Sequence, residues 1–358
     1  MNGRNEEGMG KHKKIKVGIT SGDVHGIGLE VTIKALMDSR VYDHCTPIIY
    51  ASKQVIEQHM ETLKLEGFHF HTIPDPEKCD SKKVNLLEVW DTDHEVQFGK
   101  PDKAAGKLAF DSLKSAVEDL ASTKIDVLVT APIDKKTIQS EDFNFPGHTE
   151  FLADYANEDN PLMILAHEGL RVALVTAHVA VEEIAKKLDR GLIVQKLDVF
   201  AKSLKQDFGI HRPRIAVLGL NPHNGDGGIM GEQESQIIAP AIQDAQEAGI
   251  LAFGPYPADG FFGSPMRGSF DGVLAMYHDQ GLAPFKALSF DEGVNFTAGL
   301  PIVRTSPDHG VAYDIAGKNQ ASESSMRRAI LQACDIAVER RHFREISANP
   351  LEPASKKR

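Results

Sequence analysis

Short apolar runs alternate with longer amphipathic runs along most of this sequence, and this alternation constrains the fold more than any other feature. The apolar runs are rich in Val, Ile and Leu, which is typical of strands covered on both faces. The predicted strands span residues 15–20, 47–51, 125–131, 162–166, 171–177, 214–220 and 272–277. The predicted helices span residues 103–122, 181–204, 232–248 and 324–340. This order predicts an α/β fold with a largely parallel sheet.

The composition excludes several classes of protein. A length of 358 residues is enough for two domains, and the net charge of −11 argues against binding to nucleic acid or to an anionic membrane. No apolar run is long enough to cross a bilayer, and the first residues lack the apolar region of a secretory signal. The 3 cysteines are far apart, which fits a reducing compartment. We therefore expect a cytoplasmic protein whose residues 1–14 and 350–358 are disordered.

Three predicted strands end next to a histidine. His178, His223 and His278 follow the apolar runs 171–177, 214–220 and 272–277. Because ligand sites in open α/β sheets form beyond the carboxyl ends of strands, the three imidazoles predict a divalent-metal site with an open coordination position. The alternative is three independent histidines in the second shell or at the surface. The remaining histidines are predicted to be solvated, among them His12, His59 and His342.

The segment 275–286, AMYHDQGLAPFK, raises a question of its own. Its apolar run ends in three polar side chains, His278, Asp279 and Gln280, and a short apolar turn then leads to Lys286. A core has no use for such a cluster. The segment therefore predicts that a lysine is delivered to the same site as the histidine.

Two glycine-rich loops invite a dinucleotide-binding interpretation but have the wrong spacing. GDVHGIGLEV at 22–31 reads GxxxGxG, and GDGGIMGEQE at 225–234 reads GxGxxxG. Neither fits the GxGxxG fingerprint, and no P-loop sequence is present. A nucleotide cofactor would therefore have to be held by another segment.

That segment is suggested by a family resemblance. DHGVAYDIAGKN at 308–319 is similar to the loop that binds the adenosine part of the nicotinamide cofactor in the isocitrate and isopropylmalate dehydrogenase superfamily. Further segments, in order, resemble the 4-hydroxythreonine-4-phosphate dehydrogenase family over roughly residues 15–340. They are VGITSGDVHGIGLEV, VTAPIDK, FPGHTEFLA, NPHNGDGGIMGEQE, GPYPADGFF, MYHDQGLAPFKAL and GVNFTAGLPIVRTSPDHGVAYDIAGK.

The resemblance implies a role for particular residues. His178, His223 and His278 fall on the metal ligands of that family, the same residues that the strand ends indicate. The substrate-binding positions fall on His148, Thr149, Lys286, Asn295 and Arg304. The cofactor-binding positions fall on His309, Gly310, Asp314 and Asn319. For the catalytic base we favour Asp259, with His148 as the competitor, although a Pro-x-Asp-Gly sequence around Asp259 is equally typical of a turn.

The resemblance also implies a fold and a reaction. The expected fold is the two-domain α/β/α architecture of the isocitrate dehydrogenase type, with the active site between the domains. Residues 1–138 and 296–358 would form the cofactor-side domain and residues 139–295 the second domain. The implied reaction is the oxidation of 4-phosphooxy-L-threonine at C3 by NAD or NADP, giving a β-keto acid that decarboxylates to 3-amino-2-oxopropyl phosphate in pyridoxal 5'-phosphate synthesis. One divalent ion per site (Zn, Mg, Co or Mn) and a homodimer with shared active sites are implied as well.

Two departures from the family pattern leave a related substrate open. Where the family has Gly-Asp-Pro-Ala-Gly-Ile-Gly-Pro, this chain has Val24, His25 and, at the end, Leu29; Ile229 replaces a frequent histidine. D-Threonate or D-erythronate 4-phosphate are the alternative substrates. A non-catalytic metal-dependent binding protein and a phosphotransacetylase-like acyltransferase are rival functions. The intact segment 308–319 argues against the first rival, and the three histidines argue against the second.

Overall fold

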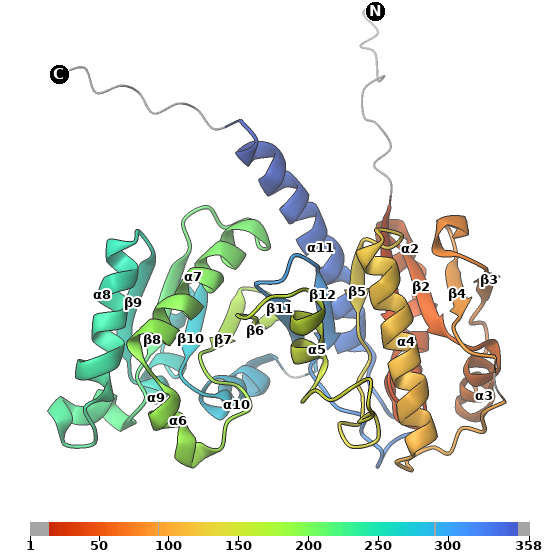
Figure 1. The fold of residues 1–358 in the computed structure, drawn as a ribbon, viewed down its shortest axis with the longest axis horizontal. Coiled ribbons are helices and arrows are strands. Elements are labelled where there is room, and N and C mark those ends of the chain that lie inside the picture. The colour runs from red at the N-terminus through yellow and green to blue at the C-terminus, as the bar shows by residue number, and fades with distance from the viewer. Residues whose placement is uncertain (1–13, 92, 290, 350–358) are drawn as a thin grey trace, which may run out of the picture.

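The computed structural model describes residues 14–91, 93–289 and 291–349, and its strands form one mixed sheet (Figure 1). The strand order is β3-β4-β2-β1-β5-β12-β11-β6-β7-β10-β8-β9. The strands in chain order are β1 (Ile15–Thr20), β2 (Cys45–Ala51), β3 (Phe70–Ile73), β4 (Val84–Glu88), β5 (Val127–Val129), β6 (Leu162–His167), β7 (Leu170–Leu174), β8 (Arg214–Leu218), β9 (Leu251–Tyr256), β10 (Gly272–Ala275), β11 (Val294–Ala298) and β12 (Arg304–Pro307).

Helices cover both faces of this sheet. They are α1 (Gly28–Met37), α2 (Val41–His44), α3 (Lys53–Leu63), α4 (Lys103–Ala121), α5 (His148–Tyr155), α6 (Val181–Lys187), α7 (Arg190–Gln206), α8 (Ala239–Glu247), α9 (Ala258–Phe262), α10 (His278–Ser289) and α11 (Ser324–Ser347). Shorter helical turns are η1 (Pro76–Lys78), η2 (Pro222–Gly228), η3 (Glu234–Ile238, a π turn) and η4 (Pro265–Ser269).

Most neighbouring strands are parallel, as the sequence predicted. The exceptions surround β6 and β11: β6 is antiparallel to both β7 and β11, and β11 is antiparallel to β12. The strands β7, β10 and β8 are parallel neighbours, with β10 in the middle. Their carboxyl ends therefore share one edge of the sheet. The proposed domain boundary between residues 295 and 296 falls inside β11, and the division into two domains stays a prediction.

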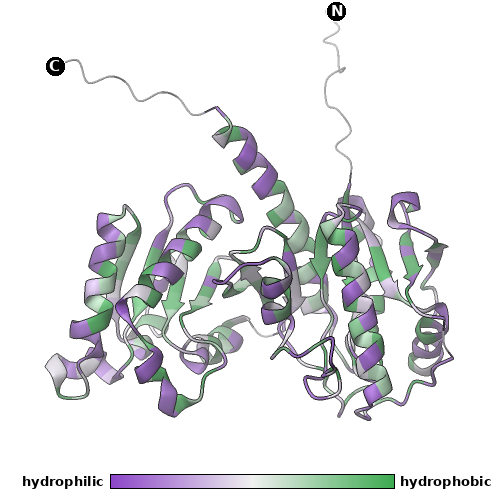
Figure 2. Ribbon diagram, in the orientation of Figure 1, coloured by the Kyte–Doolittle hydropathy of each residue, from purple (hydrophilic) through white to green (hydrophobic). Residues whose placement is uncertain are grey.

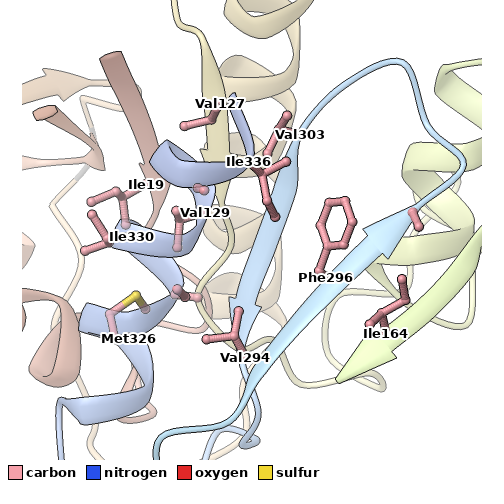
Figure 3. Close-up of a cluster of buried hydrophobic side chains, with 14 of the residues drawn as sticks. Ile19, Val127, Val129, Ile164, Val294, Phe296, Val303, Met326, Ile330 and Ile336 are labelled. Atoms are coloured by element: carbon pink, nitrogen blue, oxygen red, sulfur yellow. The ribbon is translucent and has the colours of Figure 1, made fainter. Parts of the chain in front are cut away.

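Successive side chains of a strand belong to hydrophobic clusters on opposite faces of the sheet. In β5, Val127 and Val129 join the cluster that contains Met326, Ile330 and Ile336 of α11 (Figure 3). Leu128, between the two valines, belongs instead to the cluster with the buried face of α4. This alternation follows from the period of two residues in a strand. β5 is therefore packed between α11 on one face of the sheet and α4 on the other.

The distribution of hydrophobic and hydrophilic residues agrees with this arrangement. Hydrophobic residues concentrate on the strands, and hydrophilic residues lie on the outward faces of the helices (Figure 2). Among the residues that the structure describes, no helix combines the length and the apolar character that a membrane crossing requires.

The structure corrects several details of the sequence interpretation. The helix predicted at 181–204 is two helices, because Asp189 caps α7 by accepting a hydrogen bond from Leu192 N at 2.9 Å. The helix predicted at 232–248 begins with the π turn η3, and α11 continues to Ser347. The apolar turn expected before Lys286 is helix α10, which contains Pro284.

Two further corrections concern disorder and solvation. Lys14, which was expected to be disordered, donates hydrogen bonds through Nζ to the carbonyl oxygens of Tyr42 and Ser81; the rest of 1–14 and all of 350–358 lie outside the described residues. His59 was expected to be solvated, but its side chain is completely buried in α3. His342 is exposed as expected, and His12 lies outside the described residues.

Candidate active site

One cleft of the protein collects side chains from segments far apart in the sequence. It lies where β5 ends, where α5 begins, and beside β11, β12 and α10. All five predicted substrate-binding residues line it, together with His178, His309 and Gly310. Those five are His148, Thr149, Lys286, Asn295 and Arg304. Lys135, Glu150 and Asp308 also line the cleft, and sequence reasoning gave them no role.

The cleft carries more positive than negative charge, with Lys135, Lys286 and Arg304 against Glu150 and Asp308. Arg304 is fully buried, and its guanidinium donates hydrogen bonds to the hydroxyls of Thr130, at 2.7 and 3.0 Å, and Thr297, at 3.3 Å. Burial lowers the pKa of Arg304 to about 10, so the side chain stays charged at neutral pH. Lys286 lies 3.3 Å from a carboxylate oxygen of Asp308. Because Lys135 adds a further positive charge, the cleft suits an anionic ligand.

Several buried polar atoms in the cleft have no hydrogen-bond partner within the described part of the protein. They are Nε2 of His148, Oε2 of Glu150, Oδ1 of Asn295 and Nε2 of His309. Such atoms are costly unless a ligand or water satisfies them. Burial also lowers the pKa of both His148 and His309, so both rings are neutral at pH 7. The cleft can therefore offer neutral donors and acceptors beside fixed positive charge.

The three predicted metal ligands are only partly brought together. The ring centroids of His178 and His278 lie 6.2 Å apart, and Nδ1 of His178 lies 3.5 Å from Oε1 of Glu150. The hydrogen bond from His178 lowers the pKa of Glu150. His223 instead lines a neighbouring pocket that also contains Asp259. In the described part of one chain, the three imidazoles do not bring their nitrogens within 4.8 Å of one another.

His223 has an unusual backbone conformation. It lies in η2 with a φ of 52°, the left-handed region, and Asn224 and Asp226 share this conformation. The loop is held by Glu234, whose Oε1 accepts hydrogen bonds from the amides of Leu220 and Asn221, both at 2.7 Å. Non-glycine residues in this conformation are uncommon and cluster at functional sites.

The segment 308–319 is fixed against the first glycine-rich loop. Tyr313 donates a hydrogen bond from its hydroxyl to Asp23 Oδ2 at 2.7 Å, and Ile27 N donates to Val311 O at 3.0 Å. Asp314 is exposed, whereas the Asn319 side chain donates to Leu63 O at 3.0 Å. One donor of the Asn319 side chain is thus held by the protein, while the contact between Asp23 and Tyr313 is one that the sequence did not reveal.

Gln280 explains part of the polar cluster in the segment 275–286. Its Oε1 accepts a hydrogen bond from Met276 N at 2.7 Å, and its Nε2 donates to Gly219 O at 2.6 Å. The side chain therefore ties the end of β10 to the end of β8. Gln280 positions two of the histidine-bearing strand ends relative to each other.

The missed residues differ in the signal they carry. Glu150 follows His148 and Thr149 in the PGHTE sequence, so its place in the cleft could have been inferred from its neighbours. Asp308 precedes the recognised His309, but only the tertiary structure places it beside Lys286 of α10. Thr130 lies in the VTAPIDK sequence, but nothing there shows that its hydroxyl binds Arg304.

Comparisons with known proteins identify the family. The family described as "Pyridoxal phosphate biosynthetic protein PdxA" matches residues 43–333. A protein from Bacteroides thetaiotaomicron named 4-hydroxythreonine-4-phosphate dehydrogenase is 50% identical over 342 residues, which is 95% of this chain and 94% of the relative. A relative from Oceanobacillus iheyensis, named "Putative D-threonate 4-phosphate dehydrogenase", is 38% identical over 91% of this chain and 98% of its own length.

Solved structures agree as well. The crystal structure of 4-hydroxythreonine-4-phosphate dehydrogenase from Klebsiella pneumoniae superimposes with a TM-score of 0.79 at 33% identity, covering 92% of this chain and 99% of the other. The α/β fold and these matches define an oxidoreductase. More particularly, the chain belongs to the PdxA family of pyridoxal phosphate biosynthetic proteins.

Proposed function

We propose that this protein oxidises 4-phosphooxy-L-threonine at C3 with NAD and releases 3-amino-2-oxopropyl phosphate after decarboxylation, a step in pyridoxal 5'-phosphate synthesis. The observation that carries the proposal is the 50% identity to a named 4-hydroxythreonine-4-phosphate dehydrogenase over almost the whole chain. The cationic cleft supports it, because the substrate has a carboxylate at one end and a phosphate at the other.

The charged residues of the cleft would bind the two anionic ends of the substrate. Arg304 is preorganised by its two threonine partners and Lys286 by Asp308, so little side-chain entropy is lost on binding. The amides at the start of α5, next to His148 and Thr149, can add donors for an anion. Asn295 would use its unpartnered Oδ1 to accept a hydrogen bond from the amine or a hydroxyl of the substrate.

The residues around His178 fit a divalent metal. His178 and His278 approach from adjacent strand ends, and His223 would supply the third imidazole. Three imidazoles with an open position suit zinc or cobalt, and a metal held there would lower the pKa of the substrate hydroxyl. Glu150, whose Oε1 lies close to His178, would orient that ring in the way a second-shell carboxylate does.

The segment 308–319 would hold NAD. His309 and Gly310 line the cleft, and exposed Asp314 is available to accept hydrogen bonds from a ribose. Bound NAD would accept the hydride from C3. The chain's own part is to place the nicotinamide beside the substrate and to exclude water. Asn319 would orient its exposed amide for the cofactor through the hydrogen bond that its Nδ2 donates to Leu63 O.

A homodimer with shared active sites would bring the predicted site residues together. Within one chain, His223 and Asp259 line a different pocket from the one that holds His148 and Arg304. A partner subunit could bring the two pockets together across a twofold interface. Asp259 from that pocket would then be the general base. His148 is the weaker candidate, since burial holds its pKa well below the ordinary value and makes it a poor proton acceptor.

A substrate panel tests the proposal. Purified protein with Zn²⁺ or Co²⁺ and NAD or NADP is mixed with 4-phosphooxy-L-threonine, D-threonate 4-phosphate and D-erythronate 4-phosphate, and reduced nicotinamide is followed by absorbance. We expect the highest kcat/KM with 4-phosphooxy-L-threonine and NAD. A higher value for D-threonate 4-phosphate would favour the activity named for the 38% identical relative. The His178→Ala protein is the negative control.

A further inference from the structure

A second group of metal-ligand side chains lies outside the cleft. His25, in the first glycine-rich loop, His94, in the connection that precedes α4, and Asp102, the N-cap of α4, bring one ligand atom each within 4.8 Å of the others. The Nε2 atoms of the two histidines are 2.9 Å apart. In the described part of the chain, this is the one group of three or more His, Cys, Asp or Glu residues with that geometry.

A backbone hydrogen bond orients the ring of His25. His25 is buried, and its Nδ1 lies 2.8 Å from Lys100 O, a carbonyl that can only accept, so Nδ1 carries the proton. This contact orients the ring so that Nε2 points towards His94. Metal-bound histidines are held in the same way, with the other ring nitrogen donating to a carbonyl or carboxylate. A single hydrogen bond between the two rings is the competing explanation of the short Nε2–Nε2 distance.

The other two donors are also held in place. His94 is fixed through its backbone, because its carbonyl oxygen accepts from Gln58 Nε2 at 2.7 Å and its amide donates to Gln54 Oε1 at 3.2 Å. Asp102 uses Oδ2 to accept from the amides of Ala104 and Ala105, which leaves Oδ1 available. Tetrahedral zinc, with bonds of roughly 2.0–2.1 Å, needs ligand atoms about 3.3 Å apart. The three donor atoms here lie within 4.8 Å of one another.

We propose that His25, His94 and Asp102 form a second divalent-metal site, one that takes zinc, cobalt or a similar borderline cation. Two imidazoles and one carboxylate are donors that such cations prefer over magnesium or calcium. The site is not part of the pattern that the family resemblance supplies, because His25 is one of the departures from that pattern. It lies on the cofactor-side half of the sheet, away from the strand ends that carry His178, His223 and His278.

The metal would join three segments: the first glycine-rich loop, the connection before α4 and the start of α4. The first two lie against the backbone of residues 311–313. His25 O accepts from Gly99 N at 2.9 Å. A side chain on Gly26 would approach Val311 O to 2.8 Å, and one on Gly99 would approach Tyr313 O to 2.7 Å. These backbones are therefore in close contact. A cation between His25, His94 and Asp102 would tie the glycine-rich loop to the start of α4. It would also hold the backbone of residues 311–313 in place, and this effect does not depend on whether the segment 308–319 binds NAD.

Metal titration of the full-length, untagged protein tests the proposal. The starting variant is His178→Ala/His223→Ala/His278→Ala, which removes the donors of the other proposed site. After treatment with a chelator, Co²⁺ is added and both the visible absorption of bound cobalt and the cobalt content after dialysis are measured. We expect one ion per chain. Adding His94→Gln should weaken binding at least tenfold, and so should Asp102→Asn, which keeps a helix-capping side chain.

The control is His71→Gln, which changes an exposed histidine of β3. It should leave cobalt binding unchanged, and circular dichroism should show that every variant is folded. The proposal is overturned if the folded triple variant binds no cobalt in this titration. It is also overturned if a folded His94→Gln variant binds cobalt as tightly as its parent. In the latter case, the close approach of the two rings is a hydrogen bond.

Discussion

Arg304 and Thr130 are joined by two hydrogen bonds: the Nη2 and Nε atoms of the guanidinium both donate to Thr130 Oγ1, at 2.7 and 3.0 Å. Thr130 follows β5 and Arg304 begins β12, and the two strands are parallel neighbours. No carboxylate lies within 4.0 Å of Arg304 in the described part of the chain. The guanidinium is therefore held by neutral hydroxyls, and its positive charge remains available to an anion in the cleft.

Replacing Arg304 by lysine should weaken substrate binding. A lysine keeps the charge but cannot bind Thr130 and Thr297 while presenting a planar pair of donors. Loss of a charge-assisted hydrogen bond costs roughly 1.5–3 kcal/mol, so we expect KM for the phosphorylated substrate to rise about 10- to 100-fold. KM for NAD should change little. Steady-state kinetics at varied substrate and varied NAD separates the two, with Arg212→Lys at an exposed site as the control.

Mixtures of inactive variants should reveal whether the metal ligands are shared between subunits. His178→Ala and His223→Ala are expected to be inactive alone. If each site takes His178 from one chain and His223 from the other, a heterodimer has one site without either residue and one site with both. Activity should therefore reappear after subunit exchange, up to about half of the sites in the heterodimer.

The control mixture combines His178→Ala with the double variant His178→Ala/His223→Ala, which cannot form an intact site. Subunit exchange is checked by native mass spectrometry. Activity that stays absent in the first mixture, although heterodimers are present, would mean that each chain builds its own three-histidine site.

Asp314→Ala should affect the cofactor and not the substrate. Asp314 is exposed in the segment 308–319, and the lysine nearby, Lys318, binds its backbone oxygen rather than its carboxylate. Removing the side chain should raise KM for NAD about tenfold, the effect of losing roughly 1.4 kcal/mol. Asp159→Ala changes another exposed loop residue and serves as the control. A rise confined to KM for the substrate would contradict the cofactor assignment.

The buried ring of His59 should make the protein less stable as the pH falls below 6.5. Burial lowers the pKa of His59 from 6.5 to about 4, while Nε2 donates to Val24 O at 2.8 Å. Between these values the unfolded chain binds a proton that the folded chain does not, so the free energy of unfolding decreases on acidification. The full effect is about 3 kcal/mol by pH 4.

Urea unfolding of the metal-free protein at several pH values measures this loss. His59→Gln keeps a donor for Val24 O but cannot titrate, so its stability should depend less steeply on pH between 4 and 6.5. His342→Gln, at an exposed position, should follow the wild-type curve. Equal slopes for wild type and His59→Gln would show that His59 takes up its proton in the folded state.

The sequence by itself determined the α/β class and several residues of the cleft. Strand periodicity and the carboxyl-end rule located His178, His223 and His278, and ordered motifs located His148 and Arg304, because these signals are local in the chain. The family matches confirm the α/β fold and the oxidoreductase class. The roles of the individual site residues stay predictions.

Tertiary packing alone decided the rest. A helical pattern does not show that α3 is covered at His59, and Gly281 and Pro284 concealed the helix α10. Lys286 meets Asp308, and His25 meets His94, 69 residues later in the chain, only after the sheet has brought their segments together. Burial and long-range contacts depend on which segments pack against each other, and no local pattern in a single sequence specifies that pairing.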